Sequence, residues 1–182
     1  AEEMFKQNQE IETIIDSSPI MIFYKDRENR IIRTNKSFAD LVGKTKKQLE
    51  GKSCFELFPK YGEKYWHDDM KVISSGSAKR NIIEMLETVR GEKWVQTDKF
   101  PVKDKNGAVI GLIAFSIDIT DRKKAAERIR QDRLKLQVLL DSVFDAIFLE
   151  NIDGRILDCN QAAERMLGYS KDELKRMNTS DL

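Results

Sequence analysis

An internal repeat constrains this chain more than any other feature of its sequence. Residues 14–51 align without gaps onto residues 139–176, at an offset of 125 positions. Ten of the 38 aligned positions are identical, and the apolar positions stay in phase. The identical pairs are Asp16/Asp141, Ser17/Ser142, Ile22/Ile147, Phe23/Phe148, Arg30/Arg155, Ile31/Ile156, Asn35/Asn160, Gly43/Gly168, Lys46/Lys171 and Leu49/Leu174. The chain is therefore expected to hold one module of about 105 residues, a connector and the opening of a second copy.

The position of the repeat predicts that the chain is a fragment of a longer tandem array. If the first copy ends near Thr120, the second would end near position 245, about 63 residues past Leu182. Residues 139–182 would then form the first hairpin and short helices of the second copy without its three long strands. Because a two-stranded hairpin is marginal by itself, we expect this segment to be poorly ordered or to pack on a partner.

Composition narrows the classes of protein to consider. A net charge of +1, from 32 basic and 31 acidic residues, argues against a nucleic-acid binder, which needs a clustered basic excess. Two cysteines and one histidine offer no disulfide framework and no metal site, and they fit a reducing, cytoplasmic compartment. The longest nearly unbroken apolar run, residues 109–117, is too short for a membrane span, so no membrane contact is expected.

The hydrophobic pattern predicts a mixed α+β module. A helix over residues 2–16 precedes a hairpin formed by residues 20–24 and 31–34, and Asn35 is placed to cap the next helix. That helix buries Phe38, Leu41 and Val42 and ends at Gly43. Further helices are expected over 45–50, 53–58 and 61–75, and strands over 81–89, 93–103 and 109–120. Five antiparallel strands with the helices on one face follow from this order.

The ordered set of motifs resembles the PAS domain, a sensory module of bacterial and archaeal signalling proteins. The resemblance rests on residues 31–35 leading into the Phe38/Gly43 helix, the helix end at 68–76, the Gly91-Glu92-Lys93-Trp94 turn, Asn106-Gly107, and the closing Asp-Ile-Thr-Asp-Arg-Lys over 118–123. It covers residues 14–120, and residues 139–182 as a first half. We expect an N-terminal amphipathic helix (1–16), a PAS domain (17–120), a connector helix (121–145) and a truncated second PAS domain (146–182).

The connector carries a heptad pattern. A parallel coiled coil in a homodimer would pass a rotation or register change between the PAS units, whereas an amphipathic helix would pack on its own domain. With PAS modules on both sides, the dimeric connector is favoured. The heptad seam consists of Ala126, Ile129, Arg133, Leu136, Leu140 and Val143.

The strand-to-helix junction is a candidate signal hinge formed by Asp118, Thr120 and Arg122. Asp118 is expected to hold the sheet, and Thr120 or Asp121 to cap the helix. An ordinary cap without a switching role would use the same residues.

Haem and flavin are not expected as cofactors. In haem-binding PAS proteins, as the resemblance implies, the histidine ligand lies about eleven residues before the glycine that ends the helix; His67 is nine before Gly76, and Tyr65 occupies that place. Cys54 lacks the arginine and glutamine that follow the reactive cysteine of flavin sensors, which favours a small buried thiol. Asp69 is expected to meet a basic residue.

In PAS folds small ligands lie between the sheet and the helices. The lining depends on strand register, because a slip of one residue inverts every assignment. Polar anchors are sought among Glu84, Gln96, Thr97 and Lys99. The candidate pocket residues are Phe38, Leu41, Trp66, Met70, Ile83, Met85, Trp94, Thr97, Ile113 and Phe115.

No motif of an enzyme is present, so no catalytic residue is assigned and the fragment is expected to catalyse nothing. The resemblance implies a sensory or signal-relay module, with an output domain downstream in the same chain, most consistent with a histidine kinase. An unknown small molecule would be the stimulus. The alternatives are a PAS module that only mediates dimerisation, and the input region of a diguanylate cyclase or another output.

Overall fold

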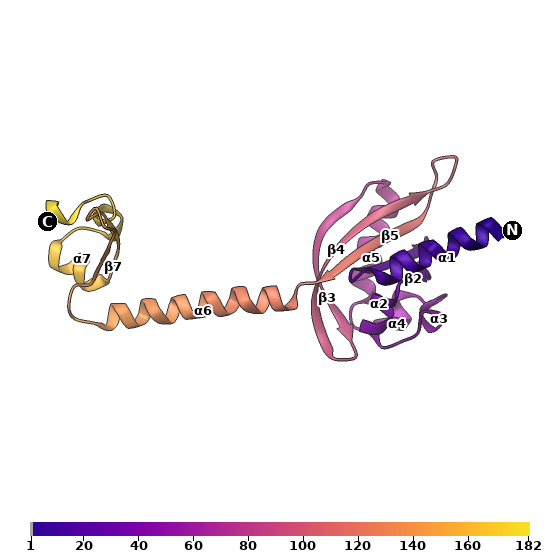
Figure 1. Ribbon diagram of the computed structural model, residues 1–182, viewed down its shortest axis with the longest axis horizontal. Coiled ribbons are helices and arrows are strands. Elements are labelled where there is room, and N and C mark those ends of the chain that lie inside the picture. Colours follow the sequence, from indigo (N-terminus) through magenta and orange to yellow (C-terminus); the bar gives the residue numbers. More distant parts are fainter. Residues whose placement is uncertain (1) are drawn as a thin grey trace. The chain divides into compact units, whose positions relative to one another are not determined.

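The computed structural model describes residues 2–182 and divides into two compact units, Ala1–Lys123 and Lys124–Leu182 (Figure 1). The expected first segment begins at Ala1, which lies outside the described residues. Among residues 2–182, no helix combines the length and apolar character that a membrane crossing requires.

The first unit has the helix and strand order that the hydrophobic pattern predicts. Its elements are α1 (Glu2–Ser17), β1 (Met21–Asp26), β2 (Ile31–Thr34), α2 (Lys36–Val42), α3 (Lys46–Leu49), α4 (Cys54–Leu57), α5 (Gly62–Ser75), β3 (Lys79–Thr88), β4 (Gly91–Lys103) and β5 (Val109–Asp118).

One five-stranded antiparallel sheet organises this unit, with the strand order β2-β1-β5-β4-β3. The expectation of an α+β fold with five antiparallel strands is confirmed. The long hairpin of β4 and β5 is visible in Figure 1, and its turn has Gly107 at φ +83°. The Asp104 carboxylate accepts hydrogen bonds from the backbone N–H groups of Asn106 and Ala108 and so fixes this turn.

Alternating side chains give the sheet an inner and an outer face. The inner side chains pack against α2, α4 and α5 and form most of the buried core. They are Met21, Phe23 and Lys25 of β1, Ile82, Glu84 and Leu86 of β3, Val95, Thr97 and Lys99 of β4, and Leu112, Ala114 and Ser116 of β5.

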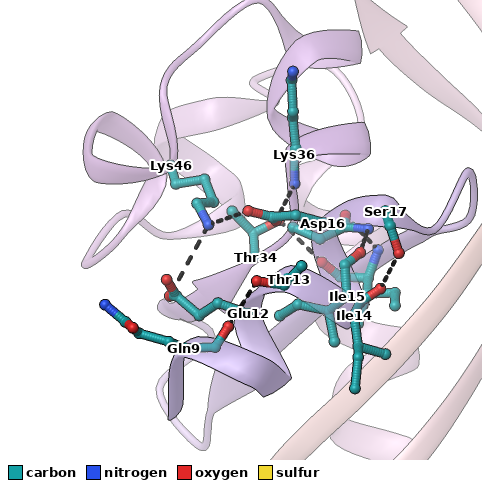
Figure 2. A network of polar contacts seen from close by, with 12 residues as sticks. Gln9, Glu12, Thr13, Ile14, Ile15, Asp16, Ser17, Thr34, Lys36 and Lys46 are labelled. Carbon is teal, nitrogen blue, oxygen red and sulfur yellow. Dashed lines mark hydrogen bonds and ion pairs between the residues drawn. The ribbon is translucent and has the colours of Figure 1, made fainter. Parts of the chain in front are cut away.

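The entry to the sheet is fixed by polar contacts at the end of α1 (Figure 2). The Asp16 carboxylate accepts a hydrogen bond from Lys36 N and pairs with Lys46 Nζ at 2.7 Å. Asn35 Oδ1 accepts from the backbone of Ile22 and caps α2, while its Nδ2 donates to the carbonyl of Ile15. Asn35 is buried, so it joins α1, β1 and α2 at one point.

The second unit shows equivalent contacts at the aligned positions. Asp141 accepts a hydrogen bond from Gln161 N, and Asn160 accepts from Ile147 N while donating to the carbonyl of Leu140. Gln161, Ile147 and Leu140 align with Lys36, Ile22 and Ile15, which are the partners of Asp16 and Asn35 in the first unit. The elements of this unit, with the helix that leads into it, are α6 (Thr120–Ser142), β6 (Phe148–Glu150), β7 (Ile156–Cys159), α7 (Gln161–Leu167), α8 (Lys171–Leu174) and η1 (Thr179–Asp181).

Helix α6 is shorter than the connector predicted over residues 121–145. It begins at Thr120 and ends at Ser142, so Val143 lies outside the helix. The amide group of Asn160 donates hydrogen bonds to the carbonyls of Leu140, Val143 and Asp145. These bonds hold the chain where it leaves α6 for β6. Residues 121–145 contain no glycine or proline, so the sequence did not indicate that the helix ends at Ser142.

Candidate ligand-binding site

A small cavity lies between the inner face of the sheet and the helices. Its volume is about 30 Å³, which is room for about two water molecules. One part of its wall is aromatic and aliphatic, and the other carries amino, carboxylate, hydroxyl and thiol groups. The lining residues are Phe23, Lys25, Ile31, Phe38, Cys54, Phe58, Tyr65, Glu84, Leu86, Val95, Thr97, Lys99 and Ser116.

A buried ionic cluster forms part of the polar wall. Asp69 of α5 pairs with Lys25 Nζ through Oδ2 at 2.7 Å and with Lys99 Nζ through Oδ1 at 2.6 Å. All three residues are at most 3% exposed. The expectation that Asp69 meets a basic residue is confirmed, since it joins one lysine from each of β1 and β4. Two ammonium groups share one carboxylate here, so the cluster carries an excess positive charge.

Cys54, at the start of α4, extends this cluster. Its Sγ lies 2.6 Å from Lys25 Nζ, and the residue is 1% exposed. Burial raises the pKa of the Cys54 thiol, against the opposing effect of the nearby Lys25 charge. For Lys25, burial disfavours the ammonium form, but the Asp69 carboxylate and Cys54 outweigh burial and raise the pKa. The lysine is therefore charged and the cysteine is a neutral thiol at neutral pH.

Glu84 of β3 supplies a second carboxylate to the cavity wall. It is 5% exposed, and its Oε2 is buried without a hydrogen-bond partner among residues 2–182. Beside it in the lining, Thr97 Oγ1 and Ser116 Oγ are hydrogen bonded at 2.8 Å. Tyr65 donates its hydroxyl to the carbonyl of Met85, and burial raises its pKa. Glu84 is thus an acceptor that the described protein leaves unused.

The junction between β5 and α6 lies two residues beyond the Ser116 hydroxyl. Asp118 Oδ1 accepts a hydrogen bond from Thr120 N at 2.8 Å, and its Oδ2 lies 3.1 Å from Lys93 Nζ. Thr120 Oγ1 accepts from Trp94 N at 2.9 Å. The expected hinge residues Asp118 and Thr120 therefore tie the start of α6 to β4, whereas Arg122 is exposed.

Only some of the predicted lining residues face the cavity. Phe38 and Thr97 line the cavity, and Leu41 and Met70 are partly buried against the core outside it. Trp66 is 38% exposed on α5. The structure corrects the remaining expectations, because the strand register turns these side chains to the outer face: Ile83, Met85, Trp94, Ile113 and Phe115.

The predicted polar anchors show the same division. Glu84, Thr97 and Lys99 face the cavity, while Gln96 faces outward and donates to Asn81 Oδ1. Sequence reasoning missed Lys25 and Ser116. A signal for Lys25 exists: it follows Met21 and Phe23 at alternate positions of one strand, so it shares their buried face.

His67 and the α6 seam complete the predicted positions. His67 is exposed, and Tyr65, two residues earlier, lies in the cavity wall. On α6, Ala126, Ile129, Arg133 and Leu136 are exposed, Leu140 is half-buried, and Val143 follows the helix. Leu134, Val138 and Leu139 are also exposed on this helix.

Comparison with known proteins decides the family. The profile of the PAS fold matches residues 15–124, and a second PAS fold profile matches residues 134–182. The chain belongs to the PAS family. The resemblance drawn from the sequence motifs is confirmed.

Relatives of this PAS chain have several outputs. It is 27% identical over 136 residues to the bacterioopsin transcriptional activator of Halobacterium salinarum, covering 72% of this chain and 20% of that protein. It is 28% identical over 133 residues to the aerobic respiration control sensor protein ArcB of Escherichia coli, covering 70% and 17%. The probable diguanylate cyclase DgcE of Escherichia coli is 31% identical over 72 residues, covering 40% and 6%. The chain thus spans a fifth or less of these relatives, which support a sensory PAS module.

Solved structures share the fold. The PAS domain of a protein from Colwellia psychrerythraea has a TM-score of 0.54 at 21% identity, covering 65% of this chain and 98% of that one. VqmA bound to DPO has a TM-score of 0.55 at 18% identity, covering 92% and 75%.

Proposed function

We propose that this chain is the sensory region of a signalling protein in which the cavity binds a small molecule and α6 carries the bound state to a downstream domain. The observation that carries the proposal is the buried Lys25–Asp69–Lys99 cluster in the cavity wall. Replacing a buried ion cluster by apolar residues is often neutral or stabilising, so such a cluster is weak evidence for a structural role. Lys25 and Lys99 share the cavity wall with the unused Glu84 acceptor, and this set of polar groups favours recognition of a polar molecule.

A short path through the sheet supports the relay. Thr97 and Ser116 face the cavity on neighbouring strands, and their hydroxyl groups are joined. Two residues further along β5, Asp118 holds the start of α6, and Thr120 is hydrogen bonded to Trp94 on β4. A molecule that moves β4 against β5 would therefore change the contacts that hold the first turn of α6.

The output domain that we propose first is a histidine kinase, because a relative, sporulation kinase E of Bacillus subtilis, is a kinase and is 19% identical over 180 residues. A diguanylate cyclase is the second candidate, favoured by the match to DgcE. Structural neighbours include a PAS-fold protein bound to DPO, which supports small-molecule binding at such a fold. We also propose a cytoplasmic location, in keeping with the free cysteines Cys54 and Cys159. We propose no direct contact with nucleic acid, in keeping with the net charge of +1.

Mass spectrometry of small molecules released from the denatured, freshly purified chain tests the proposal. We expect a stoichiometric molecule from the wild type and none from Thr97→Leu, whose larger side chain fills the cavity. Gln96→Leu is the matched control, because it makes a similar change on the outer face of the same strand. Both variants are checked for folding by circular dichroism, and an absorption spectrum should show no haem or flavin band. Equal release from both variants would place the molecule elsewhere, and no release from the wild type would favour a ligand-free module.

A dimeric α6 is the second part of the proposal, and it would also serve a PAS module without a ligand. Ile129 and Leu136 are 69% and 56% exposed at seam positions. Leu136→Glu should shift the chain from dimer to monomer in light scattering after gel filtration, because a charge at a core position opposes helix pairing. Val138→Glu makes a similar change on the other side of the helix, where Val138 is 68% exposed. If both variants keep the wild-type mass, the seam is not the dimer contact.

A further inference from the structure

Lys25 and Cys54 form a pair whose separation is unusually short. Cys54 Sγ lies 2.6 Å from Lys25 Nζ, and both residues are at most 3% exposed. Hydrogen bonds of the N–H···O type measure about 2.7–3.2 Å, and sulfur is larger than oxygen, so an N–H···S hydrogen bond should be longer still. The two atoms are therefore closer than an unbonded nitrogen and sulfur should approach.

The same distance indicates which covalent link would fit between the two atoms. A direct S–N bond would be much shorter, since even the two larger sulfur atoms of a disulfide are bonded at about 2.0 Å. A single oxygen atom bonded to both would hold them near the observed distance, because two single bonds that meet at a bent oxygen span more than one bond and less than a hydrogen bond to sulfur. The geometry thus accommodates a link of one atom.

The backbone brings these two side chains together. Lys25 lies on the buried face of β1, and Cys54 is the first residue of α4. The N–H of Ile31 donates to the carbonyl of Lys52, and the carbonyl of Ile31 accepts from the N–H of Gly51. The strand that follows Lys25 is therefore tied to the segment that precedes Cys54. The approach of Nζ and Sγ is fixed by two ordered elements rather than by mobile surface side chains.

The second unit shows that the fold does not require an amine and a thiol at this place. Its backbone makes the equivalent contact, since the N–H of Ile156 donates to the carbonyl of Met177. At the offset of 125 positions, however, the lysine and the cysteine are replaced by Glu150 and Thr179. The pair is a property of the first unit alone, which indicates a role other than holding the fold.

We infer that Lys25 and Cys54 are a site of oxidative modification, at which dioxygen joins Nζ to Sγ through one oxygen atom. Both residues line the cavity, whose volume of about 30 Å³ admits dioxygen but excludes bulky oxidants. Oxidation of a cysteine sulfur by bonding to oxygen is the first step of its ordinary oxidation chemistry. The step needs no ligand in the cavity. Because the link would tie β1 to α4, it gives the sensory region an oxygen-dependent state.

The step balances with dioxygen as the only co-reactant. The S–H bond of Cys54, two N–H bonds of the Lys25 ammonium group and the O–O bond break, and one S–O and one N–O bond form. Sulfur and nitrogen each lose two electrons, and these four electrons reduce dioxygen. One oxygen atom becomes the bridge, and the other leaves as water with the thiol hydrogen and one hydrogen from nitrogen. The remaining proton passes to Asp69 Oδ2, which lies 2.7 Å from Lys25 Nζ.

Peptide mass spectrometry of the full chain tests the site. One sample is kept in air without a reductant and the other under argon with dithiothreitol, and both are denatured, alkylated with iodoacetamide and digested. The sample kept in air should yield a joined peptide that contains Lys25 and Cys54. Its mass should be that of the two separate peptides plus one oxygen atom and minus two hydrogen atoms. In a sample kept under ¹⁸O₂, the joined peptide should carry the heavy isotope.

Three variants control the assignment. Cys54→Ser, which replaces the thiol by a hydroxyl of similar size, should yield no joined peptide. Cys159→Ala removes the other buried cysteine, and Lys52→Arg removes a half-exposed lysine close to Cys54; both should yield the joined peptide as the wild type does. A joined peptide without the added oxygen, an oxygen on Cys54 without a link, a link through Lys52, or only separate unmodified peptides from the sample kept in air would overturn the inference.

Discussion

Removal of the Asp69 carboxylate should be one of the most damaging single changes in this chain. Asp69 is 1% exposed, and its carboxylate pairs with both Lys25 and Lys99. Breaking a buried ion pair by removing one partner costs about 3–5 kcal/mol, and two lysines depend on this group, so Asp69→Asn is expected near the upper end. A domain of this size is stable by about 5–15 kcal/mol, so this single change removes a third or more of its stability.

Urea unfolding followed by tryptophan fluorescence measures this loss, because Trp66 and Trp94 both lie in the first unit. With an m-value of about 1–3 kcal/mol/M, a loss of this size lowers the midpoint by about 2–5 M. The adjacent Asp68 is the matched control, since it pairs with Lys79 and Lys71, whose side chains are 38% and 55% exposed. Asp68→Asn should cost at most about 1 kcal/mol. If Asp69→Asn costs no more than Asp68→Asn, the buried charges are not as described.

An apolar replacement of the whole cluster separates stability from recognition. The triple variant Lys25→Met, Asp69→Leu, Lys99→Met removes the three charged groups of the ion cluster together. It should be as stable as the wild type or more so, as found for other buried ion clusters. It should also release no small molecule on denaturation. A triple variant that unfolds like Asp69→Asn would mean that the cluster holds the fold together.

Three smaller predictions use other parts of the first unit. In urea unfolding, Gly51→Ala should lower the free energy of unfolding by about 1 kcal/mol, because Gly51 has a left-handed φ of +78°. Gly43→Ala, at φ +72°, should lower it by at least about 1 kcal/mol more, because its new Cβ would lie 2.0 Å from a valine side-chain carbon. Equal losses in the two variants would contradict this. Because burial raises the pKa of Cys54, a Cys159→Ala chain should react with a thiol reagent at pH 8 many times more slowly when native than in urea, and rapid native reaction would show an open cavity. Burial opposes ionisation of Asp118, but hydrogen bonding by Thr120 and pairing with Lys93 outweigh it and lower the pKa of Asp118. The hydrogen bond from Thr120 N to the Asp118 carboxylate is therefore present above the ordinary Asp range and is lost as pH falls through the folded pKa. The NMR shift of the Thr120 amide should titrate below about pH 3.9, and a midpoint above that would refute the contact.

The sequence predicts the order of the elements well because each has local signals. Asn35 caps α2, Gly43 ends it in a left-handed conformation, and Asn106-Gly107 turns β4 into β5, as expected. Asp16 and Asn35, marked by their identity with Asp141 and Asn160, make the contacts that fix the start of the sheet.

The cavity lining could not be predicted in the same way, because both faces of the long strands carry apolar residues. In β3, Ile82 and Leu86 point inward while Ile83 points outward; in β4 the same holds for Val95 and Trp94. Hydrophobic alternation cannot choose between such registers. The predicted polar anchors were more accurate than the apolar ones, because Glu84, Thr97 and Lys99 all face the cavity, whereas Gln96 faces outward.

Hydrogen exchange of the first turn of α6 tests the central claim, that the cavity and this helix are coupled. Thr97→Leu imitates an occupied cavity, and Gln96→Leu controls for the added leucine. The account predicts slower exchange over residues 119–123 in Thr97→Leu, because a filled cavity braces β4 and β5, the strands that hold Thr120. Gln96→Leu should exchange like the wild type there. Identical exchange in all three proteins would show that the cavity does not communicate with α6, and the relay would be wrong.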